Sequence, residues 1–371
     1  MWDHAIESIR CPRCTAAVRL DTLPASDASP RSGPAWVETG ALFCDTCRVL
    51  YPIWKGVPIL LTYTTPLAEM TVGSWPAATR SAWRGAGFRL PSDQAPKGEQ
   101  FVGASFSTEW ADYEYGATLW TAPTDDRIQT FQGECGLKKG DLKGKRFCEI
   151  GCGLGIMTNE AATTLGAEAW GMDLSSAVFR AAAQFRSNSM LHFVQASIFA
   201  PPFEPGAFGF VYSHGVLHHT WSTKAAVARA VTLVRDDGGF YVWLYGYDDV
   251  RISVTRRIAF AAEALVRPVL ARLPPKMATV AQLPLIPMYQ VASLLGKSSG
   301  THGTVYSAKE ALHAARDRFT PLYAHRHEVD EVAGWLKEMG FNHIHVVKEN
   351  EVAPSWSLAI KRNVSVRARR N

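Results

Sequence analysis

The stretch that decides the fold is Phe147-Cys-Glu-Ile-Gly-Cys-Gly-Leu-Gly155. Its first four residues read as a short buried strand, and the three alternating glycines that follow form a turn opening a helix. Glycines at such a turn let the backbone approach a ligand closely, and the N-terminus of a helix adds partial positive charge. The sequence therefore predicts a ligand-binding turn at the end of a strand.

Four further apolar runs follow this turn, and stretches of helical character separate them. They are AEAWGMDLS (167–175), LHFVQASI (191–198), FGFVYSHGVL (208–217) and GGFYVWLYG (238–246). This alternation is typical of an α/β fold with a parallel sheet and crossover helices. Asp173 ends the second strand, where a carboxylate can accept both hydrogen bonds of a ribose diol.

The pattern Glu149-x-Gly151-x-Gly153-x-Gly155 with Asp173 resembles the class I S-adenosylmethionine-dependent methyltransferases. Residues 208–220 and 229–246 are similar to that family's fourth strand, following helix and fifth strand. The resemblance implies a Rossmann-like, seven-stranded methyltransferase sheet over residues 101–250 and 297–362, with S-adenosylmethionine as cofactor. A dinucleotide-binding oxidoreductase is the alternative, although its fingerprint places the third glycine one residue later.

The resemblance also implies which residues contact the cofactor. Ser197 lies at the end of the third strand, where the family often has aspartate. SFSTEWADY (105–113) is similar to the helix that closes over the cofactor in this family. The expected cofactor-binding residues are Glu149, Gly151, Gly153, Gly155, Asp173, Ser197, Phe106 and Trp110. For Phe106 and Trp110, a packed helix face is the alternative.

Candidate catalytic residues follow the fourth and fifth strands, at the carboxyl edge where ligands bind in such sheets. Methyl transfer mainly requires alignment of the reactants, but a hydroxyl acceptor also has to lose a proton. His214, His218 and His219 are the predicted proton acceptors, with a purely structural turn as the alternative. Tyr245 and Asp248 are further candidates.

Two Cys-x-x-Cys pairs near the N-terminus predict a metal site. Cys11, Cys14, Cys44 and Cys47 offer the four thiolates that a structural zinc ion prefers. Four unmetallated cysteines, or two disulfides, are the alternatives. Together with YPIWKGVPILL (51–61), the pairs resemble the small zinc-ribbon protein that activates tRNA and translation-factor methyltransferases. The resemblance implies a zinc-ribbon β-domain over residues 1–63, and the Pro/Ser/Ala-rich residues 64–100 are predicted as a linker.

Residues 251–296 are predicted to form a helical lid insert. Six basic residues and one acid, Glu263, lie between Arg251 and Lys276, and the uncharged stretch 277–296 follows. Pro284 and Pro287 argue against a membrane span, so we expect an interfacial lid over a small-molecule or lipid-linked acceptor, with membrane-surface contact. A cap that completes the core or forms a homodimer is the alternative. Beyond the lid, a helix at 330–341, strands at 343–350 and 355–362, and a disordered basic tail at 363–371 are predicted.

The composition of the chain excludes several classes of protein. The chain has 371 residues with 47% hydrophobic and 20% charged residues, which excludes a disordered chain or a coiled coil. A net charge of +5 is low for a dedicated nucleic-acid binder. The N-terminus lacks a secretory-signal pattern, so a cytoplasmic enzyme that can associate with a membrane surface is expected. The sequence favours a methyltransferase acting on a small-molecule, natural-product or glycolipid-type acceptor. The alternatives are an RNA methyltransferase whose zinc ribbon binds RNA, and an inactive scaffold.

Overall fold

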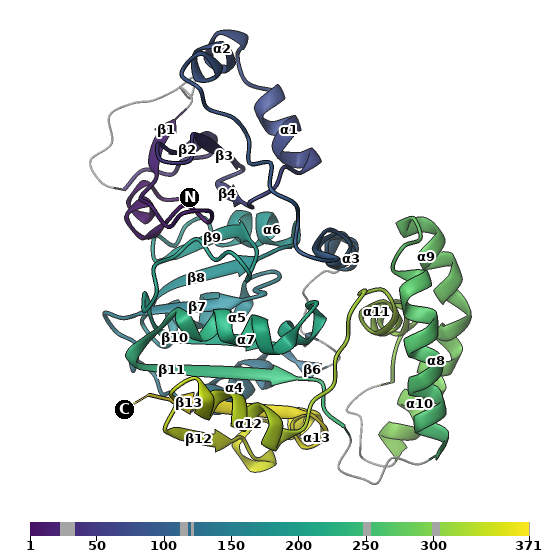
Figure 1. Ribbon diagram of the computed structural model, residues 1–371. Helices are drawn as coiled ribbons and strands as arrows, with labels where there is room; N and C mark the ends of the chain where they lie inside the picture. The colour runs from purple at the N-terminus through teal and green to yellow at the C-terminus, as the bar shows by residue number, and fades with distance from the viewer. Residues whose placement is uncertain (23–33, 112–117, 120–121, 248–253, 299–304, 371) are drawn as a thin grey trace. The chain divides into compact units, whose positions relative to one another are not determined.

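The computed structural model describes residues 1–22, 34–111, 118–119, 122–247, 254–298 and 305–370 (Figure 1). The chain divides into two compact units. Unit 1 comprises residues 1–96, 139–211 and 225–238, and unit 2 comprises residues 97–138, 212–224 and 239–371.

Unit 1 contains the predicted parallel strands β7 (Arg146–Ile150), β8 (Glu168–Asp173) and β9 (Leu191–Ala196). β8 pairs in parallel with both neighbours, and nearly all residues of the three strands are buried. The connections are made by α5 (Ile156–Thr163) and α6 (Ala177–Gln184). Strands buried on both faces read as continuous apolar runs, which is why the sequence revealed them.

The N-terminal β-domain of unit 1 begins with the 3-10 helix η1 (Asp3–Ser8). An antiparallel meander follows, made of β1 (Arg19–Thr22), β2 (Gly40–Cys44), β3 (Val49–Trp54) and β4 (Val57–Leu60). β4 then pairs in parallel with β9, with Ile59 opposite Gln195 and Leu60 opposite Ala196. The N-terminal β-domain therefore extends the parallel sheet.

This pairing corrects the predicted strand number. The sheet has 11 strands, in the order β1-β2-β3-β4-β9-β8-β7-β10-β11-β13-β12. β10 (Phe208–His214) and β11 (Val234–Leu244) run through both units. The expected seven strands are those from β9 to β12 in this order, and the four strands of the N-terminal β-domain join them because β4 pairs with β9.

Residues 64–100, predicted as a linker, contain α1 (Pro66–Gly73) and α2 (Ala77–Gly85) and the start of α3 (Glu99–Ala111). Trp75 and Phe88 are buried with Phe43 of β2, and the Phe43 and Phe88 ring centroids are 4.8 Å apart. The aromatic residues between the helices thus attach much of this segment to the N-terminal β-domain, although Pro, Ser and Ala dominate its composition.

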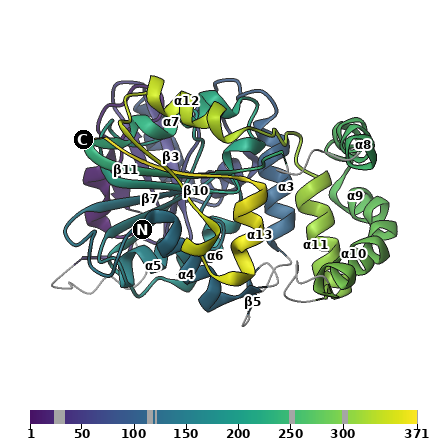
Figure 2. The ribbon, with the colours of Figure 1, turned by 90° about the horizontal axis from the view of Figure 1, so that it is seen from below.

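Unit 2 begins at α3 and the hairpin β5 (Thr118–Leu119) and β6 (Ala122–Pro123), followed by α4 (Thr124–Cys135). The 3-10 helix η2 (Leu217–His219) follows β10, and α7 (Thr223–Thr232) leads to β11. The lid insert is helical as predicted, with α8 (Val254–Leu270), α9 (Pro275–Gln282), the 3-10 helix η3 (Leu283–Leu285) and α10 (Ile286–Ser298). α11 (Ala308–Phe319) packs against these helices within unit 2 (Figure 2). The lid residues 251–253 lie outside the described residues.

The C-terminal part of unit 2 differs from the prediction at two places. α12 (Val329–Glu338), β12 (His343–Val346) and the 3-10 helix η4 (Glu349–Glu351) are followed by α13 (Pro354–Arg362), where a strand was expected. Pro354 starts this helix, and Trp356 and Ile360, four residues apart, are buried. The predicted disordered tail forms β13 (Val364–Arg369), antiparallel to β11 and β12. Val364, Val366 and Ala368 alternate on its buried face, so Arg367 and Arg369 do not keep the segment in solvent.

Candidate active site and metal site

The glycine turn of unit 1 connects β7 to α5. Gly151, Gly153 and Gly155 all have positive φ, of 75°, 52° and 76°. At Gly155 a Cβ atom would also lie 2.7 Å from the Phe193 ring, so both conformation and space require glycine there. The turn is fixed to the neighbouring strand, because the Gly151 N–H donates to the Met172 carbonyl at 2.7 Å.

Asp173 faces this turn from the end of β8. One carboxylate oxygen accepts from the Gly153 N–H at 2.7 Å, and the other accepts from the Ser175 N–H at 2.7 Å. Burial raises the pKa of Asp173, while the hydrogen bonds from Ser175 and Gly153 oppose the shift. Each oxygen has a further lone pair, so the carboxylate is oriented in advance to accept from a diol.

Two other predicted cofactor residues of unit 1 lie at the same carboxyl edge. Ser197 follows β9, two residues after Gln195, which pairs with Asp173. The Ser197 hydroxyl accepts from the Phe199 N–H at 3.1 Å. Glu149 is buried in β7, and its carboxylate accepts from the Thr158 hydroxyl of α5. The structure therefore brings together all six cofactor residues predicted in unit 1.

The remaining predicted residues belong to unit 2, where η2 places two histidines close to α3. The ring centroids of Phe106 and His219 are 5.2 Å apart. His219 Nδ1 lies 2.7 Å from the Tyr323 carbonyl, to which it can donate as the neutral tautomer, and burial lowers its pKa to about 3. Burial also lowers the pKa of His218, whose ring centroid is 4.0 Å from that of Tyr245. Both imidazoles are therefore neutral near pH 7.

His214, the third predicted proton acceptor, belongs to a buried network. Its Nδ1 lies 2.9 Å from Glu134 Oε1, and its ring stacks on Trp243 at 4.6 Å. Glu134 also pairs with Arg127 at 3.0 Å and accepts from the Tyr212 hydroxyl at 2.7 Å. These contacts suit a positioning role for His214.

This network makes the stability of the protein depend on pH. Burial raises the pKa of Glu134, but Arg127 and His214 outweigh that effect and bring it to about 2. Its stabilising contribution is therefore complete above about pH 4.5 and is lost as the pH falls towards about 2. Glu134→Gln should lower the free energy of unfolding by roughly 3–5 kcal/mol at neutral pH, because Arg127 stays buried without its partner.

Urea unfolding of parent and variant at neutral and acidic pH checks this, and the difference between them should shrink in acid. Glu338→Gln removes an exposed carboxylate paired with Lys224 and is the matched control. An equal effect of the two substitutions at neutral pH would contradict the prediction.

The sequence analysis did not single out a buried acidic cluster near these histidines. We call Ser105, Glu109, His218, Tyr245 and Asp317 the acceptor cluster. Ser105 and Glu109 lie one turn apart on α3 and are 8% and 2% exposed. Among the described residues, neither Glu109 oxygen nor the Ser105 hydroxyl has a hydrogen-bond partner, and the same holds for both ring nitrogens of His218.

The cluster is closed by α11. The Tyr245 hydroxyl donates to Asp317 at 2.5 Å, and His313 Nε2 lies 3.5 Å from Glu109 Oε1. The other predicted cofactor residue of α3, Trp110, has its ring centroid 6.0 Å from that of His313. Burial and then the charge of Asp317 raise the pKa of Glu109 well above its usual range. The available sequence signal was that Ser105 and Glu109 lie four residues apart and so share one face of α3, with Val102 three residues before Ser105.

The four cysteines predicted as metal ligands do meet. Their sulfur atoms all lie within 4.8 Å of one another, and Cys14 Sγ and Cys44 Sγ are 3.5 Å apart. The Cys47 N–H points to Cys44 Sγ at 3.4 Å. Thr15 and Arg48, which follow the two pairs, have positive φ, so each pair lies in a tight turn. Four converging thiols fit a tetrahedral thiolate-bound metal.

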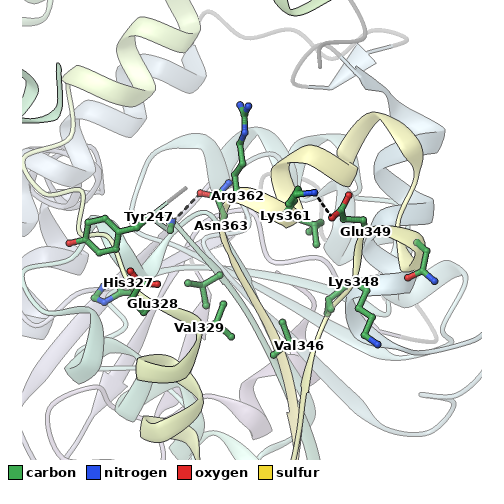
Figure 3. Close-up of a pocket in the computed structure, with 15 residues that line it drawn as sticks. Tyr247, His327, Glu328, Val329, Val346, Lys348, Glu349, Lys361, Arg362 and Asn363 are labelled. Atoms are coloured by element: carbon green, nitrogen blue, oxygen red, sulfur yellow. Dashed lines mark hydrogen bonds and ion pairs between the residues drawn. The ribbon is translucent and has the colours of Figure 1, made fainter. Parts of the chain in front are cut away.

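A separate pocket of about 430 Å³ lies within unit 2 (Figure 3). Two pairs of its lining residues contact each other: Lys361 lies 3.3 Å from Glu349, and the Gly246 N–H donates to Asn363 at 3.0 Å. None of the predicted site residues that the structure describes lines it, and the candidate Asp248 lies outside the described residues. We therefore place neither the glycine turn nor the acceptor cluster at this pocket.

Comparison with known proteins identifies the central part of the chain. Residues 148–242 match the family described as "Methyltransferase domain". Ubiquinone biosynthesis O-methyltransferases of Burkholderia thailandensis and Burkholderia mallei are 35% identical over 100 residues, which is 26% of this chain. The chain covers 43% of the length of these relatives.

Several solved structures are also similar. Geranyl diphosphate C-methyltransferase from Streptomyces coelicolor is 10% identical, with 75% of this chain and 100% of that chain covered and a TM-score of 0.45. A chain of the complex between the Haloferax volcanii Trm112 activator and a putative methyltransferase is 10% identical. The match covers 71% of this chain and 97% of that chain, with a TM-score of 0.41. Residues 148–242 match this family and contain the glycine turn. They therefore form a methyltransferase domain of the class I, S-adenosylmethionine-dependent type.

Proposed function

We propose that the protein transfers a methyl group from S-adenosylmethionine to a hydroxyl oxygen of a lipophilic small molecule. The observation that carries the cofactor assignment is the three-glycine turn whose Gly153 N–H binds Asp173 inside the matched domain. S-adenosylmethionine supplies a methyl group on a sulfonium, which an aligned nucleophile displaces. In this proposal Asp173 binds the ribose diol, the glycine turn approaches the cofactor, and Ser197 accepts from the adenine amino group.

The acceptor cluster supports a hydroxyl acceptor. A neutral hydroxyl is a poor nucleophile and has to lose its proton during transfer. Glu109 has buried oxygens without hydrogen bonds, and its raised pKa makes its carboxylate a stronger base than an ordinary glutamate. The unpartnered ring nitrogens of His218 and the hydroxyl of Ser105 can orient the acceptor. The relation to ubiquinone O-methyltransferases is consistent with this acceptor class.

We further propose that Cys11, Cys14, Cys44 and Cys47 bind one structural zinc ion. Four thiolates leave no open coordination position for a substrate. The ion would hold the two cysteine turns together and so support β4, the strand that pairs with β9.

The acceptor class is tested with cofactor labelled in its methyl group. Purified protein is incubated with organic extracts, and separately with total RNA, from the source cells. Label is expected in an organic-soluble product that resists the alkaline conditions that cleave esters. Label confined to RNA would overturn the small-molecule proposal in favour of an RNA methyltransferase.

The cofactor site is tested by Asp173→Ala. A hydrogen bond to a charged group contributes roughly 1.5–3 kcal/mol, so loss of the carboxylate should weaken S-adenosylmethionine binding at least about tenfold. Isothermal titration calorimetry measures the affinity directly. Asp141→Ala, which removes an exposed carboxylate of the same unit, is the control. Unchanged affinity in Asp173→Ala would mean that the ribose binds elsewhere.

A further inference from the structure

The lid helices of unit 2 have their polar and apolar faces reversed relative to a helix of a water-soluble protein. On α8, Val254, Ile258, Leu265 and Val269 share one face and are 62–77% exposed. The opposite face carries Glu263 and Arg267, which are 5% and 6% exposed. A helix that packs these two charged residues inward and presents aliphatic side chains outward is suited to a non-aqueous neighbour.

The inward charges of α8 are satisfied within unit 2. Glu263 pairs with Arg267 one turn along the helix and accepts from Arg318 of α11 at 2.6 Å. Arg267 also donates to the Arg318 carbonyl at 2.9 Å. These contacts fix which side of α8 faces α11, so the exposed apolar face is set by the packing of the unit.

The next two helices continue the pattern. In α9 Gln282 is fully buried and donates to Thr320 at 2.8 Å, and in α10 the buried residue is Ser293. Large apolar residues are exposed on both helices, namely Met277 and Val280 of α9 and Met288, Val291, Leu294 and Leu295 of α10. α8, α9 and α10 lie on the same side of α11 in both views (Figures 1 and 2). We call the outward side of these three helices the lid face.

The charge of the lid face indicates which kind of surface it can bind. The sequence from 254 to 298 contains six basic residues, of which Arg267 is buried, and one acid, the buried Glu263. Arg272, between α8 and α9, and Lys276, in the first turn of α9, are exposed next to the apolar residues. An apolar surface with basic residues and no exposed acid among its described residues is complementary to anionic lipid headgroups over acyl chains.

A membrane-spanning arrangement is disfavoured by the same helices. Lys276–Leu295 is long and apolar enough to cross a bilayer by length and composition alone. The 3-10 turn η3 interrupts its α-helical hydrogen bonding, however, between α9 and α10, where Pro284 and Pro287 each lack a backbone donor. Backbone groups without hydrogen bonds are costly in the hydrocarbon core, which favours an interfacial position.

We propose that the lid face docks onto the surface of an anionic lipid bilayer, with α8, α9 and α10 lying in the interface. This surface is independent of the proposed reaction, although a lipophilic acceptor dissolved in the bilayer would then be delivered beside the lid.

The test is flotation of the full-length protein with vesicles, without cofactor or acceptor. Phosphatidylcholine vesicles with about one third phosphatidylglycerol should carry the protein, and pure phosphatidylcholine should carry much less. Leu265→Glu with Val269→Glu should lower the partition coefficient at least about tenfold. Met70→Glu with Met190→Glu introduces the same change at exposed methionines of unit 1 and should leave it unchanged.

The contribution of charge is measured with Arg272→Gln and Lys276→Gln, each expected to weaken binding to anionic vesicles about fivefold. Thermal unfolding and calorimetric cofactor binding show that the variants are folded and test the cofactor site separately. No flotation of the parent, or equal flotation of the Leu265 and control variants, would overturn the proposal. Concentration-dependent dimerisation abolished by Leu265→Glu, without vesicle binding, would show that a second copy covers the lid face.

Discussion

Replacing Cys44 by serine is expected to abolish the bound zinc and to unfold the N-terminal β-domain. Cys44 Sγ lies 3.5 Å from Cys14 Sγ and accepts from the Cys47 N–H, so it connects both cysteine pairs. Structural zinc contributes roughly 10–16 kcal/mol in zinc-finger peptides, which matches or exceeds the roughly 5–15 kcal/mol stability of a typical protein. The effect should reach the cofactor site, because β4 pairs with the end of β9 just before Ser197.

Elemental analysis and hydrogen exchange measure this outcome. Parent protein should contain one zinc per chain, and Cys44→Ser should contain none and exchange rapidly in β2, β3 and β4. Cys135→Ala removes a buried cysteine outside the quartet and should keep full zinc content. Zinc-free parent protein with four freely titratable thiols in the quartet would refute the metal site.

Glu109→Gln should lower kcat about 100-fold or more without changing the affinity for S-adenosylmethionine. General-base catalysis typically contributes about 10²–10⁴-fold, and glutamine keeps the shape of the side chain while losing its basicity. Because a buried carboxylate without hydrogen bonds is costly, the variant should also unfold at a higher temperature than the parent. A purely structural role would predict the opposite change in stability.

The pH profile separates the proton acceptors. In the parent, kcat should decrease at low pH as Glu109 becomes protonated. This decrease at low pH, the acidic limb of the profile, should be absent from the residual activity of Glu109→Gln. His218→Asn should retain the limb, since its role in the proposal is to orient the acceptor. Glu338→Gln is the exposed control. A full-rate Glu109→Gln enzyme would remove Glu109 from the reaction.

Much of the fold could be predicted because its signals are local. The five strands from β7 to β11 are apolar runs of a buried parallel sheet, and the glycine turn needs three positive φ angles that glycine adopts at low cost. Cys-x-x-Cys spacing likewise fixes two thiols in one turn. The tail was misjudged although its signal was local, because alternation of Val364, Val366 and Ala368 decided its structure rather than its basic residues.

Other features depend on contacts between distant residues. The pairing of β4 with β9 joins segments more than 130 residues apart and adds four strands to the sheet. The acceptor cluster unites α3, η2, the residue after β11 and α11, so no single sequence window contains it.

The lid shows most directly which features the local sequence determines and which depend on tertiary contacts. The sequence by itself determined that α8 has an apolar stripe, a charged stripe and only one acid. Only tertiary structure decided that the charged stripe faces inward, because the partners of Glu263 include Arg318, 55 residues further along the chain. Periodicity determines that two faces differ, whereas the neighbouring helix determines which of them is left for solvent or lipid.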